Sequence, residues 1–529
     1  MKQSSGNSAT IARSAGVVGI AVMCSRVLGL IREQVFATLF GAGLAYDAFV
    51  VAFRIPNLLR DLFGEGALSA AFVTVFSDYQ TNQAKSATWQ LAANVLTFFA
   101  VILSLITLLG IYFAVPLVHV LAPDFALIPG KTALTATLTQ IMLPFLVIIS
   151  LAAVVMGMLN TNNRFFVPAI ASSFFNLGSI VAGTGLALLL PRYGIPAITG
   201  MAIGTLVGGI LQLSIQLPTL YKLGFRYRPR LNLTDPGLLR ILTLMLPATI
   251  GLSATQINIF INTNFAASCV EGSVSWLNYA FRLVQLPIGI FGVTLSIATM
   301  PLLARQAAEK NIAEMRTTLV SSLVMVLALA IPATAGLILL AEPIIRLIFE
   351  HGAFSAADTR ATAQALALYA IGLFAYSANK VLVPAFYALN RTRYPVIASF
   401  LAIGANLLLI TLTIDQFQHR AIAFSTSLTM LLNFMFLMTV ISLCMGKLPL
   451  GYLLRGCLKI VAATLVMAGL VVFGQTVAAP WLAGDILRQA LALLAIIVVA
   501  AAGYIFLLQT LRLPELTAIV TKVRQKFGR

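Results

Sequence analysis

Apolar stretches of membrane-spanning length, separated by short polar loops, make up most of this 529-residue chain. Because an α-helix needs about 20 predominantly apolar residues to cross a bilayer, each stretch predicts one spanning helix. Divided at prolines, glycines and charged clusters, the sequence predicts fourteen spans, which begin near Ala15, Leu44, Thr88, Thr132, Phe166, Ala197, Leu238, Ser273, Met315, Thr359, Tyr394, Ala421, Leu454 and Ile486. The expected fold class is an all-α polytopic membrane protein.

Composition agrees with this class, since 60% of the residues are hydrophobic and only 9% are charged. In an ordinary globular protein about a quarter of the residues are charged. The net charge of +18 would also suit a nucleic-acid-binding protein, but no basic, aromatic-interleaved patch lies on a soluble domain. We therefore expect loops that face anionic lipid and no nucleic-acid partner. The four cysteines are scattered and only three histidines occur, so neither a metal centre nor a disulfide framework is expected.

Lysine and arginine concentrate in alternate loops, which sets the expected orientation. One set of loops and ends carries Lys2, Arg13, Lys85, Arg164, Lys222, Arg226, Arg228, Arg230, Arg305, Lys310, Arg316, Arg391, Arg393, Lys447, Lys522, Arg524, Lys526 and Arg529. The opposite loops carry more of the acids than this set does, and fewer cations, among them Lys131, Arg192 and Arg360. By the positive-inside rule both termini are expected in the cytoplasm, which requires an even number of spans. The first helix is expected to be an uncleaved anchor.

The chain also repeats itself. Ala52-Phe53-Arg54 recurs as Ala280-Phe281-Arg282, an offset of 228, and Pro168–Ser172 recurs as Pro395–Ser399, an offset of 227. Six spans in each repeat leave both copies in the same orientation, so the two halves are expected to be related by an axis along the membrane normal. The predicted architecture has a six-helix lobe at 1–232, a second six-helix lobe at 233–446, and two additional helices with a basic tail at 447–529.

Charged residues interrupt the first two predicted spans. They are Arg26, Arg32 and Glu33 in the first span, and Asp47, Arg54, Arg60, Asp61 and Glu65 in the second. A charge at mid-bilayer costs at least about 2.5–3.5 kcal/mol, and arginine cannot shed its proton. Such residues persist where they face water, a partner charge or an anionic ligand, which favours a cationic cavity and an anionic cargo.

Two interpretations of these charges stay open from the residues alone. In the structural one they form buried ion pairs, namely Arg26 with Glu33, Arg54 with Asp61, and Arg60 with Glu65. In the functional one Arg32 has no obvious acid and, with Arg282 of the second repeat, indicates a missing counter-ion. A diphosphate would serve, because the planar fork of arginine binds phosphate oxygens bidentately. Arg54 and Asn57 lie on one helical stripe, and both are supporting cavity candidates.

Several motifs together resemble one family. They are Ser25-Arg-Val-Leu-Gly-Leu-Ile-Arg-Glu33, Phe40-Gly-Ala-Gly43, Asp47-Ala-Phe, Pro56-Asn-Leu-Leu-Arg60, Gly64-Glu-Gly-Ala-Leu-Ser69, Gly272-Ser-Val-Ser-Trp276 and Leu286-Pro-Ile-Gly-Ile-Phe-Gly292. Over essentially its whole length the chain is similar to the MurJ/MviN lipid II flippases. The resemblance implies a fourteen-helix member of the multidrug/oligosaccharidyl-lipid/polysaccharide exporter superfamily. Such proteins alternate between inward- and outward-facing states and carry lipid II, an undecaprenyl-diphosphate disaccharide-pentapeptide, across the bacterial inner membrane.

The resemblance also implies functional residues. Diphosphate-binding arginines fall on Arg26, Arg32, Arg60 and Arg282, and supporting cavity residues on Asp47, Asn57, Glu65 and Ser275. Two departures limit the carry-over. Phe281 and Gln285 stand where some members have acids beside the second-lobe arginine, and the seventh and eleventh helices lack the acids of the sodium site that some members have. Sodium coupling is therefore not expected.

The expected function is a lipid II flippase that works by alternating access through a cationic central cavity. No cofactor is expected and no nucleotide-binding loop occurs, so the membrane potential is the candidate drive. The alternative is a related exporter of another lipid-linked oligosaccharide or of small molecules. An intramembrane enzyme would need an acidic pair or a histidine base beside the arginines, so the chain is not expected to be an enzyme. Expected partners are lipid II and membrane lipids, with cell-wall synthesis proteins as further candidates.

Overall fold

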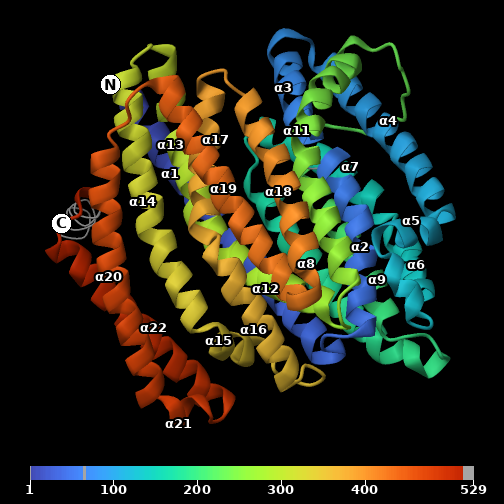
Figure 1. Ribbon diagram of the computed structural model, residues 1–529. Coiled ribbons are helices and arrows are strands. Elements are labelled where there is room, and N and C mark those ends of the chain that lie inside the picture. The colour runs from blue at the N-terminus through green and yellow to red at the C-terminus, as the bar shows by residue number, and fades with distance from the viewer. Residues whose placement is uncertain (1, 64–66, 516–529) are drawn as a thin grey trace. The chain divides into compact units, whose positions relative to one another are not determined.

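The computed structural model describes residues 2–63 and 67–515, and every regular element in these ranges is a helix (Figure 1). The chain divides into two compact units, Met1–Ser275 and Trp276–Arg529. The all-α class expected from the sequence is confirmed. The division into lobes at 1–232 and 233–446 and a pair of further helices at 447–529 stays a prediction.

Among the described residues, the first unit contains two short 3₁₀ helices (Pro123–Leu127 and Leu190–Tyr193) and eleven α-helices. The α-helices are α1 (Lys2–Phe40), α2 (Leu44–Phe63), α3 (Ala67–Asn82), α4 (Lys85–Tyr112), α5 (Ala114–Leu121), α6 (Lys131–Met142), α7 (Phe145–Thr161), α8 (Phe166–Leu189), α9 (Ile198–Ser214), α10 (Leu217–Lys222) and α11 (Pro236–Ala267). Helix α11 packs against α2, α3 and α4. It therefore contributes to the first unit, although the sequence repeat assigns it to the second lobe.

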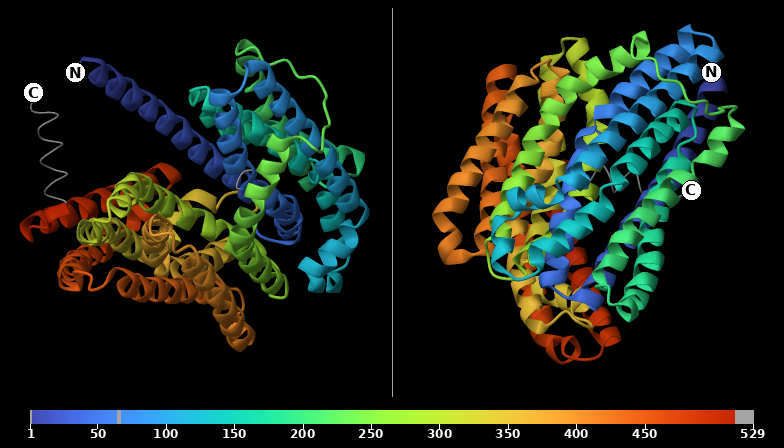
Figure 2. Two further views of the ribbon diagram at one scale, coloured as in Figure 1. Left: turned by 90° about the horizontal axis from the view of Figure 1, so that it is seen from above. Right: turned by 90° about the vertical axis from the view of Figure 1, so that its right-hand side faces the viewer.

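Small residues let α8 and α9 lie side by side (Figure 2). Gly200, Gly204 and Gly208 of α9 lie against the backbone of α8. A Cβ at Gly204 would lie 2.5 Å from Gly183 Cα, so no larger residue fits without separating the helices. Close approach at small residues is how helices associate in a bilayer, where lipid gives no hydrophobic drive between them. This pair forms one wall of the unit, and α1 packs on α8.

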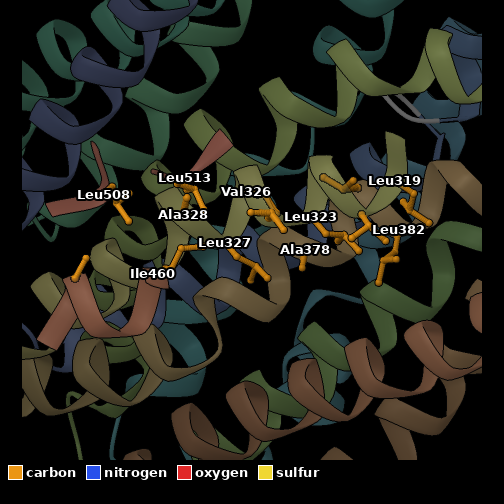
Figure 3. Packing of buried hydrophobic residues seen from close by; sticks show 14 of the residues in the cluster. Leu319, Leu323, Val326, Leu327, Ala328, Ala378, Leu382, Ile460, Leu508 and Leu513 are labelled. Carbon is orange, nitrogen blue, oxygen red and sulfur yellow. The ribbon is translucent and has the colours of Figure 1, made fainter. Parts of the chain in front are cut away.

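The second unit contains the remainder of the chain's described helices. They are α12 (Ser273–Pro287), a π-helical segment (Ile288–Val293), α13 (Thr294–Ala308), α14 (Ile312–Leu339), α15 (Ala341–Phe349), α16 (Ala356–Ile371), α17 (Leu373–Ala388), α18 (Arg393–Phe417), α19 (His419–Met445), α20 (Leu450–Val477), α21 (Ala479–Leu482) and α22 (Ile486–Thr510). Helices α14, α17, α20 and α22 meet in an apolar core that includes Leu323, Leu327, Leu382, Ile460 and Leu508 (Figure 3).

Most of the predicted spans have a helix that fits them. Among the described residues, ten segments are long and apolar enough to cross a membrane, and the bent pair α16–α17 makes eleven. They coincide with eleven of the fourteen predicted spans. The remaining three, which begin near Ala15, Leu44 and Leu238, lie on α1, α2 and α11. Because α2 carries four charged residues in 20, hydropathy does not identify it. The count of fourteen is consistent with these helices and stays a prediction.

Two spans are interrupted at positions that the repeat relates. Helices α6 and α7 meet at Pro144, and α16 and α17 meet at Gly372 with a bend of 41°. Pro144 and Gly372 are 228 residues apart, which is the offset of the first sequence repeat. At the second break the hydroxyl of Ser427 donates to the carbonyl of Leu368 at 2.6 Å. A Cβ at Gly372 would lie 2.7 Å from Ser427 Cα, so only glycine fits this bend. The repeat therefore extends from sequence motifs to helix geometry.

Candidate functional site

Two ion-paired groups form among the charged residues of α1 and α2 in the first unit. In the first group the guanidinium of Arg32 donates to Glu33 Oε1 at 2.9 Å, and the hydroxyl of Tyr46 donates to Glu33 Oε2 at 2.6 Å. The guanidinium also lies 5.4 Å from the centre of the Phe175 ring. The expectation that Arg32 lacks an acid is wrong, because the contact with Tyr46 of α2 holds Glu33 where the neighbouring Arg32 reaches it.

Arg32 nevertheless keeps unused hydrogen-bonding capacity. Its side chain is only 13% exposed, and its Nε atom is buried without a hydrogen-bond partner among the described residues. Arg26 is half-buried on the same helix and forms no ion pair within the described part of the chain. The pairing of Arg26 with Glu33 considered from sequence is therefore not formed. Arg32 takes the one carboxylate and Arg26 has none, so this part of α1 carries an excess of positive charge.

The second group lies near the far end of α2. Arg60 donates to Asp61 Oδ1 through Nε at 3.2 Å and through Nη2 at 2.8 Å. Gln256 of α11 donates to Asp61 Oδ2 at 3.1 Å. Asp61 is therefore the partner of Arg60, whereas the structural interpretation of the sequence paired it with Arg54. Glu65, the other acid expected here, lies outside the described residues.

Arg54 and Asn57 line a cavity in the first unit. The cavity has a volume of about 460 Å³ and lies between α2, α4, α5 and α11. Gln256 of α11 also lines it, and the remaining lining is mostly aliphatic and aromatic. Two of the predicted supporting residues therefore face open space.

Arg282 lies on α12 in the second unit and is half-buried. Gln285, one turn further along α12, is exposed, and the neighbouring Phe281 packs 5.3 Å from the ring of Tyr369 on α16. The first unit thus holds Arg26, Arg32, Arg54 and Arg60, and the second unit holds Arg282.

Asp47 accepts hydrogen bonds from three other residues. Its carboxylate, 1% exposed, accepts a hydrogen bond from Lys131 Nζ at 3.0 Å. It also accepts the backbone N–H of Gly272 and of Ser275, both at 3.0 Å, and the Ser275 hydroxyl at 2.6 Å. A carboxylate at a helix N-terminus satisfies otherwise unpaired N–H groups and complements the helix dipole. Asp47 and Ser275 are brought together from the first turns of α2 and α12.

The two helix starts cap each other. While Asp47 of α2 caps α12, Glu271 at the start of α12 accepts the backbone N–H of Leu44 at 2.9 Å, at the start of α2. This reciprocal arrangement, together with Lys131, is named the Asp47 junction below. It joins α2, α6 and α12 at the end of the unit where α2 begins.

Sequence reasoning missed Lys131, which it assigned to the cations of an external loop. The structure buries it to 1% exposure, 4.2 Å from the centre of the Phe125 ring, at the first residue of α6. Its partner Asp47 lies 84 residues earlier in the chain, so no local pattern reveals the pair. Two features of the sequence could have indicated the pair. Lys131 stands at the first position of an apolar helix, and Asp47 is an acid within a predicted span that requires a cation.

A related tie occurs in the second unit. The indole N–H of Trp276 on α12 donates to Asp358 Oδ1 on α16 at 2.9 Å. His419 packs edge-on against the indole, with 5.0 Å between the ring centres. Asp358 is also part of a capping box with Ser355 at the start of α16. By the offset of 228, α12 and α16 correspond to α2 and α6. Both units therefore join the second and fourth spans of their repeat through a buried carboxylate.

Comparison with known proteins extends these findings. The family model described as "Lipid II flippase MurJ" matches residues 36–492. A probable lipid II flippase MurJ of Buchnera aphidicola subsp. Acyrthosiphon pisum is 36% identical over 79% of this chain and 81% of that protein. A probable lipid II flippase MurJ of Vibrio cholerae is 33% identical over 96% of this chain and 97% of that protein.

Solved structures give the same result for the fold. A lipid II flippase MurJ in an inward closed conformation matches with a TM-score of 0.76 and 28% identity, covering 94% of this chain and 99% of that one. An inward-facing multidrug transporter of the MATE family matches with a TM-score of 0.60 at 14% identity, covering 78% of this chain and 98% of that one. The second likeness concerns the fold alone.

Proposed function

Because this chain belongs to the lipid II flippase MurJ family, we propose that it moves lipid II from the cytoplasmic to the periplasmic leaflet of the bacterial inner membrane. The observation that carries the proposal is the surplus of positive charge on α1, where Arg32 pairs with Glu33 and Arg26 forms no ion pair among the described residues. Cations inside a spanning helix need an anion or water, and a lipid-linked diphosphate supplies the anion.

Arginine suits this task better than lysine. Its planar group offers several N–H donors in a fixed fork that matches two phosphate oxygens, and it stays charged in an apolar setting. Arg32 offers a buried Nε that makes no hydrogen bond among the described residues. We infer that Arg26, Arg32 and Arg60 bind the diphosphate in the first unit and that Arg282 contributes from the second.

The Asp47 junction supports a proposal for alternating access. It joins the starts of α2 and α12, and α12 continues from the first unit into the second. We propose that the junction is closed while cargo binds from the cytoplasmic side and opens to release cargo on the other side. Four hydrogen bonds to one carboxylate make it a discrete contact that is either formed or broken, as a two-state gate requires.

The membrane potential is the proposed drive. Returning an empty carrier with surplus arginines moves positive charge inward, and each charge that crosses is worth about 2.3 kcal/mol per 100 mV. Cytoplasmic termini, as predicted from the loop charges, fit this direction. No cofactor and no sodium site are proposed. The family is one of transporters, in agreement with the expectation that the chain is not an enzyme. Cell-wall synthesis proteins stay predicted partners.

The alternative function is export of another lipid-linked oligosaccharide or of small molecules. The likeness to multidrug transporters of the MATE family concerns the fold at 14% identity and leaves cargo open. Arginine-rich helices favour an anionic cargo over the cationic drugs that acidic sites would bind. A lipid-linked oligosaccharide with a diphosphate would meet the same residues, so the test must identify the lipid itself.

The decisive experiment is complementation in a bacterium whose own lipid II flippase is depleted. Outer-leaflet lipid II is measured by its cleavage by an externally added lipid II-degrading toxin. We expect the intact chain to restore cleavage, and Arg26→Ala at equal membrane level to fail. If the intact chain is present in the membrane and no lipid II becomes cleavable, the cargo is a different one.

A further inference from the structure

Lys380 is the single charged residue in a long apolar stretch of the second unit. Between Ala361 and Asn390 the sequence has no other aspartate, glutamate, lysine or arginine. This stretch makes up most of the span formed by α16 and α17. Lys380 is exposed on α17 and forms no ion pair among the residues that the structure describes. A charge within a span indicates a functional site unless a partner charge satisfies it.

The side chain of Lys380 points toward the middle of the span. Its Nζ atom lies 5.5 Å from the centre of the Tyr376 ring, which is one helical turn closer to the start of α17. Eight residues, about 12 Å, separate Lys380 from the end of α17 at Ala388. A lysine that faced lipid here would extend its ammonium toward that nearer end, because such side chains reach for the membrane surface. Lys380 extends the opposite way, which indicates that this face of α17 meets water or a polar ligand.

Neighbouring helices occupy three sides of α17. Gly292 of the π-helical segment packs on Ser377, where a Cβ added to the glycine would lie 3.1 Å from Ser377 Cα. Leu382 belongs to the apolar core that α17 shares with α14 (Figure 3). Asn379 donates to the carbonyl of Met430 on α19 at 3.4 Å. These contacts fix the orientation of α17 and the direction in which its remaining side faces.

The remaining side of α17 carries Tyr376, Lys380 and Tyr387. The three residues are four and seven positions apart, which places their side chains on one face of a helix. Tyr387 is 48% exposed, and Lys380 is exposed as well. One ammonium and two phenol groups in line offer hydrogen bonds to a polar group and suit a cargo head group better than a hydrocarbon chain.

The span that contains Arg282 runs in the same direction as α16 and α17. Trp276 at the start of α12 donates to Asp358 at the start of α16. The contact between Gly292 and Ser377 lies further along both spans. Positions on the two spans can therefore be compared from this second contact.

Lys380 and Arg282 are about 20 Å apart along these spans. Arg282 precedes Gly292 by ten residues, and Lys380 follows Ser377 by three, at 1.5 Å for each residue. One diphosphate cannot contact both side chains at this separation. Because Arg282 is assigned to the diphosphate, Lys380 is available to another anionic group of the same cargo.

We propose that Lys380 binds a carboxylate of the cargo's peptide. This inference rests on the proposed function. A pentapeptide ends in a carboxylate, and five extended residues span up to about 17 Å. Together with two sugar rings, the peptide covers the separation between a diphosphate at Arg282 and the ammonium of Lys380. Lysine suits a mobile carboxylate in water, because its ammonium is a compact charge on a flexible stem.

The test measures binding to the full-length protein in detergent with three probes, which are lipid II, lipid II whose peptide carboxylates are amidated, and undecaprenyl diphosphate. Lys380→Gln removes the charge and keeps a polar side chain. We expect about tenfold weaker binding of lipid II, as for the loss of one hydrogen bond to a charged group, and unchanged binding of the other two probes. Lys222→Gln is the matched control, because Lys222 is exposed in the last turn of α10, and it is expected to leave all three affinities unchanged.

The amidated probe tests the same contact without a substitution, so its result does not depend on the folding of a variant. The unmodified protein is expected to bind it about tenfold more weakly than lipid II, and Lys380→Arg, which keeps the charge, is expected to retain most of the affinity for lipid II. Equal binding of the two forms of lipid II by the unmodified protein would overturn the proposal. An equal loss for undecaprenyl diphosphate and lipid II in Lys380→Gln would also overturn it, because Lys380 would then contact the diphosphate. Failure of the unmodified protein to bind lipid II in either form would instead contradict the proposed function.

Discussion

The ammonium group of Lys131 lies 3.0 Å from the carboxylate of Asp47, and each of these residues is 1% exposed. This buried ion pair joins the starts of α2 and α6, and the same carboxylate caps α12. Burying two charges costs several kcal/mol, which a pair recovers only with good geometry and further hydrogen bonds. Asp47 has both, because Gly272 and Ser275 satisfy its other lone pairs.

Loss of either partner of this pair is expected to destabilise the protein. Lys131→Met leaves Asp47 buried without its cation, and Asp47→Asn leaves Lys131 without its anion. The expected loss is about 3–5 kcal/mol for each single variant, because an uncompensated charge remains buried. The double variant is expected to recover part of the loss. Thermal unfolding of the purified protein in detergent measures these differences.

The matched control is the exposed pair of Arg240 with Asp78, whose atoms lie 2.6 Å apart with side chains 53% and 39% exposed. Arg240→Ala is expected to cost at most about 1 kcal/mol, because exposed ion pairs are screened by water and salt. Equal losses for Lys131→Met and Arg240→Ala would contradict the importance assigned to the Asp47 junction.

Arg26 separates function from stability. It is half-buried and forms no ion pair among the described residues, so Arg26→Ala removes no structural partner. The expected change in stability is within about 0.5 kcal/mol, while lipid II translocation is expected to be lost. Arg305→Ala, at an exposed position that pairs with Glu309, serves as the control for charge removal. A large loss of stability together with full transport would show that Arg26 has a structural role.

Much of this organisation could be predicted from the sequence. Hydropathy indicates the spans because a helix that crosses a bilayer satisfies all its backbone groups internally and exposes apolar side chains to lipid. Those apolar side chains can be read directly from the sequence. The motif that ends in Arg54 and its copy that ends in Arg282 indicated a repeat. The helix breaks at Pro144 and Gly372 are separated by the same offset of 228 residues and so agree with this repeat.

The partners of the charged residues could not be predicted in the same way. Helical periodicity placed Arg26 and Glu33 on one face, but Glu33 pairs with the adjacent Arg32, because the hydroxyl of Tyr46 fixes its other oxygen at 2.6 Å. That contact depends on how α1 and α2 meet. The partner of Lys131 could not be predicted for the same reason, because Asp47 is on another helix. Sequence thus identified which segments carry charge, and tertiary packing decided which charges cancel.

The contact between α8 and α9 predicts contrasting effects of two glycine substitutions. A Cβ at Gly204 would lie 2.5 Å from Gly183 Cα, so Gly204→Ala must push the helices apart. The expected cost is about 1–3 kcal/mol, as for other overpacked sites. Gly185→Ala on α8 has nothing within 4 Å of its added methyl and is expected to be neutral or slightly stabilising. Thermal unfolding of both variants measures this difference in stability. Similar losses of stability at the two positions would mean that the glycines act through backbone flexibility instead of close packing.

The drive for transport gives a prediction that stands apart from all substitutions. If surplus arginines return through the membrane with the empty carrier, an inside-negative potential speeds the return. One net charge across 100 mV is worth about 2.3 kcal/mol, so the potential can shift the carrier equilibrium by roughly 50-fold. Lipid II translocation in proteoliposomes is therefore expected to rise when a potassium gradient with valinomycin imposes an inside-negative potential. It is expected to stay constant when choline replaces sodium at a fixed potential. Translocation that follows the sodium gradient and does not depend on the potential would contradict the proposed return of charge by the arginines. It would then require a sodium site, although the seventh and eleventh predicted spans lack the acids to form one.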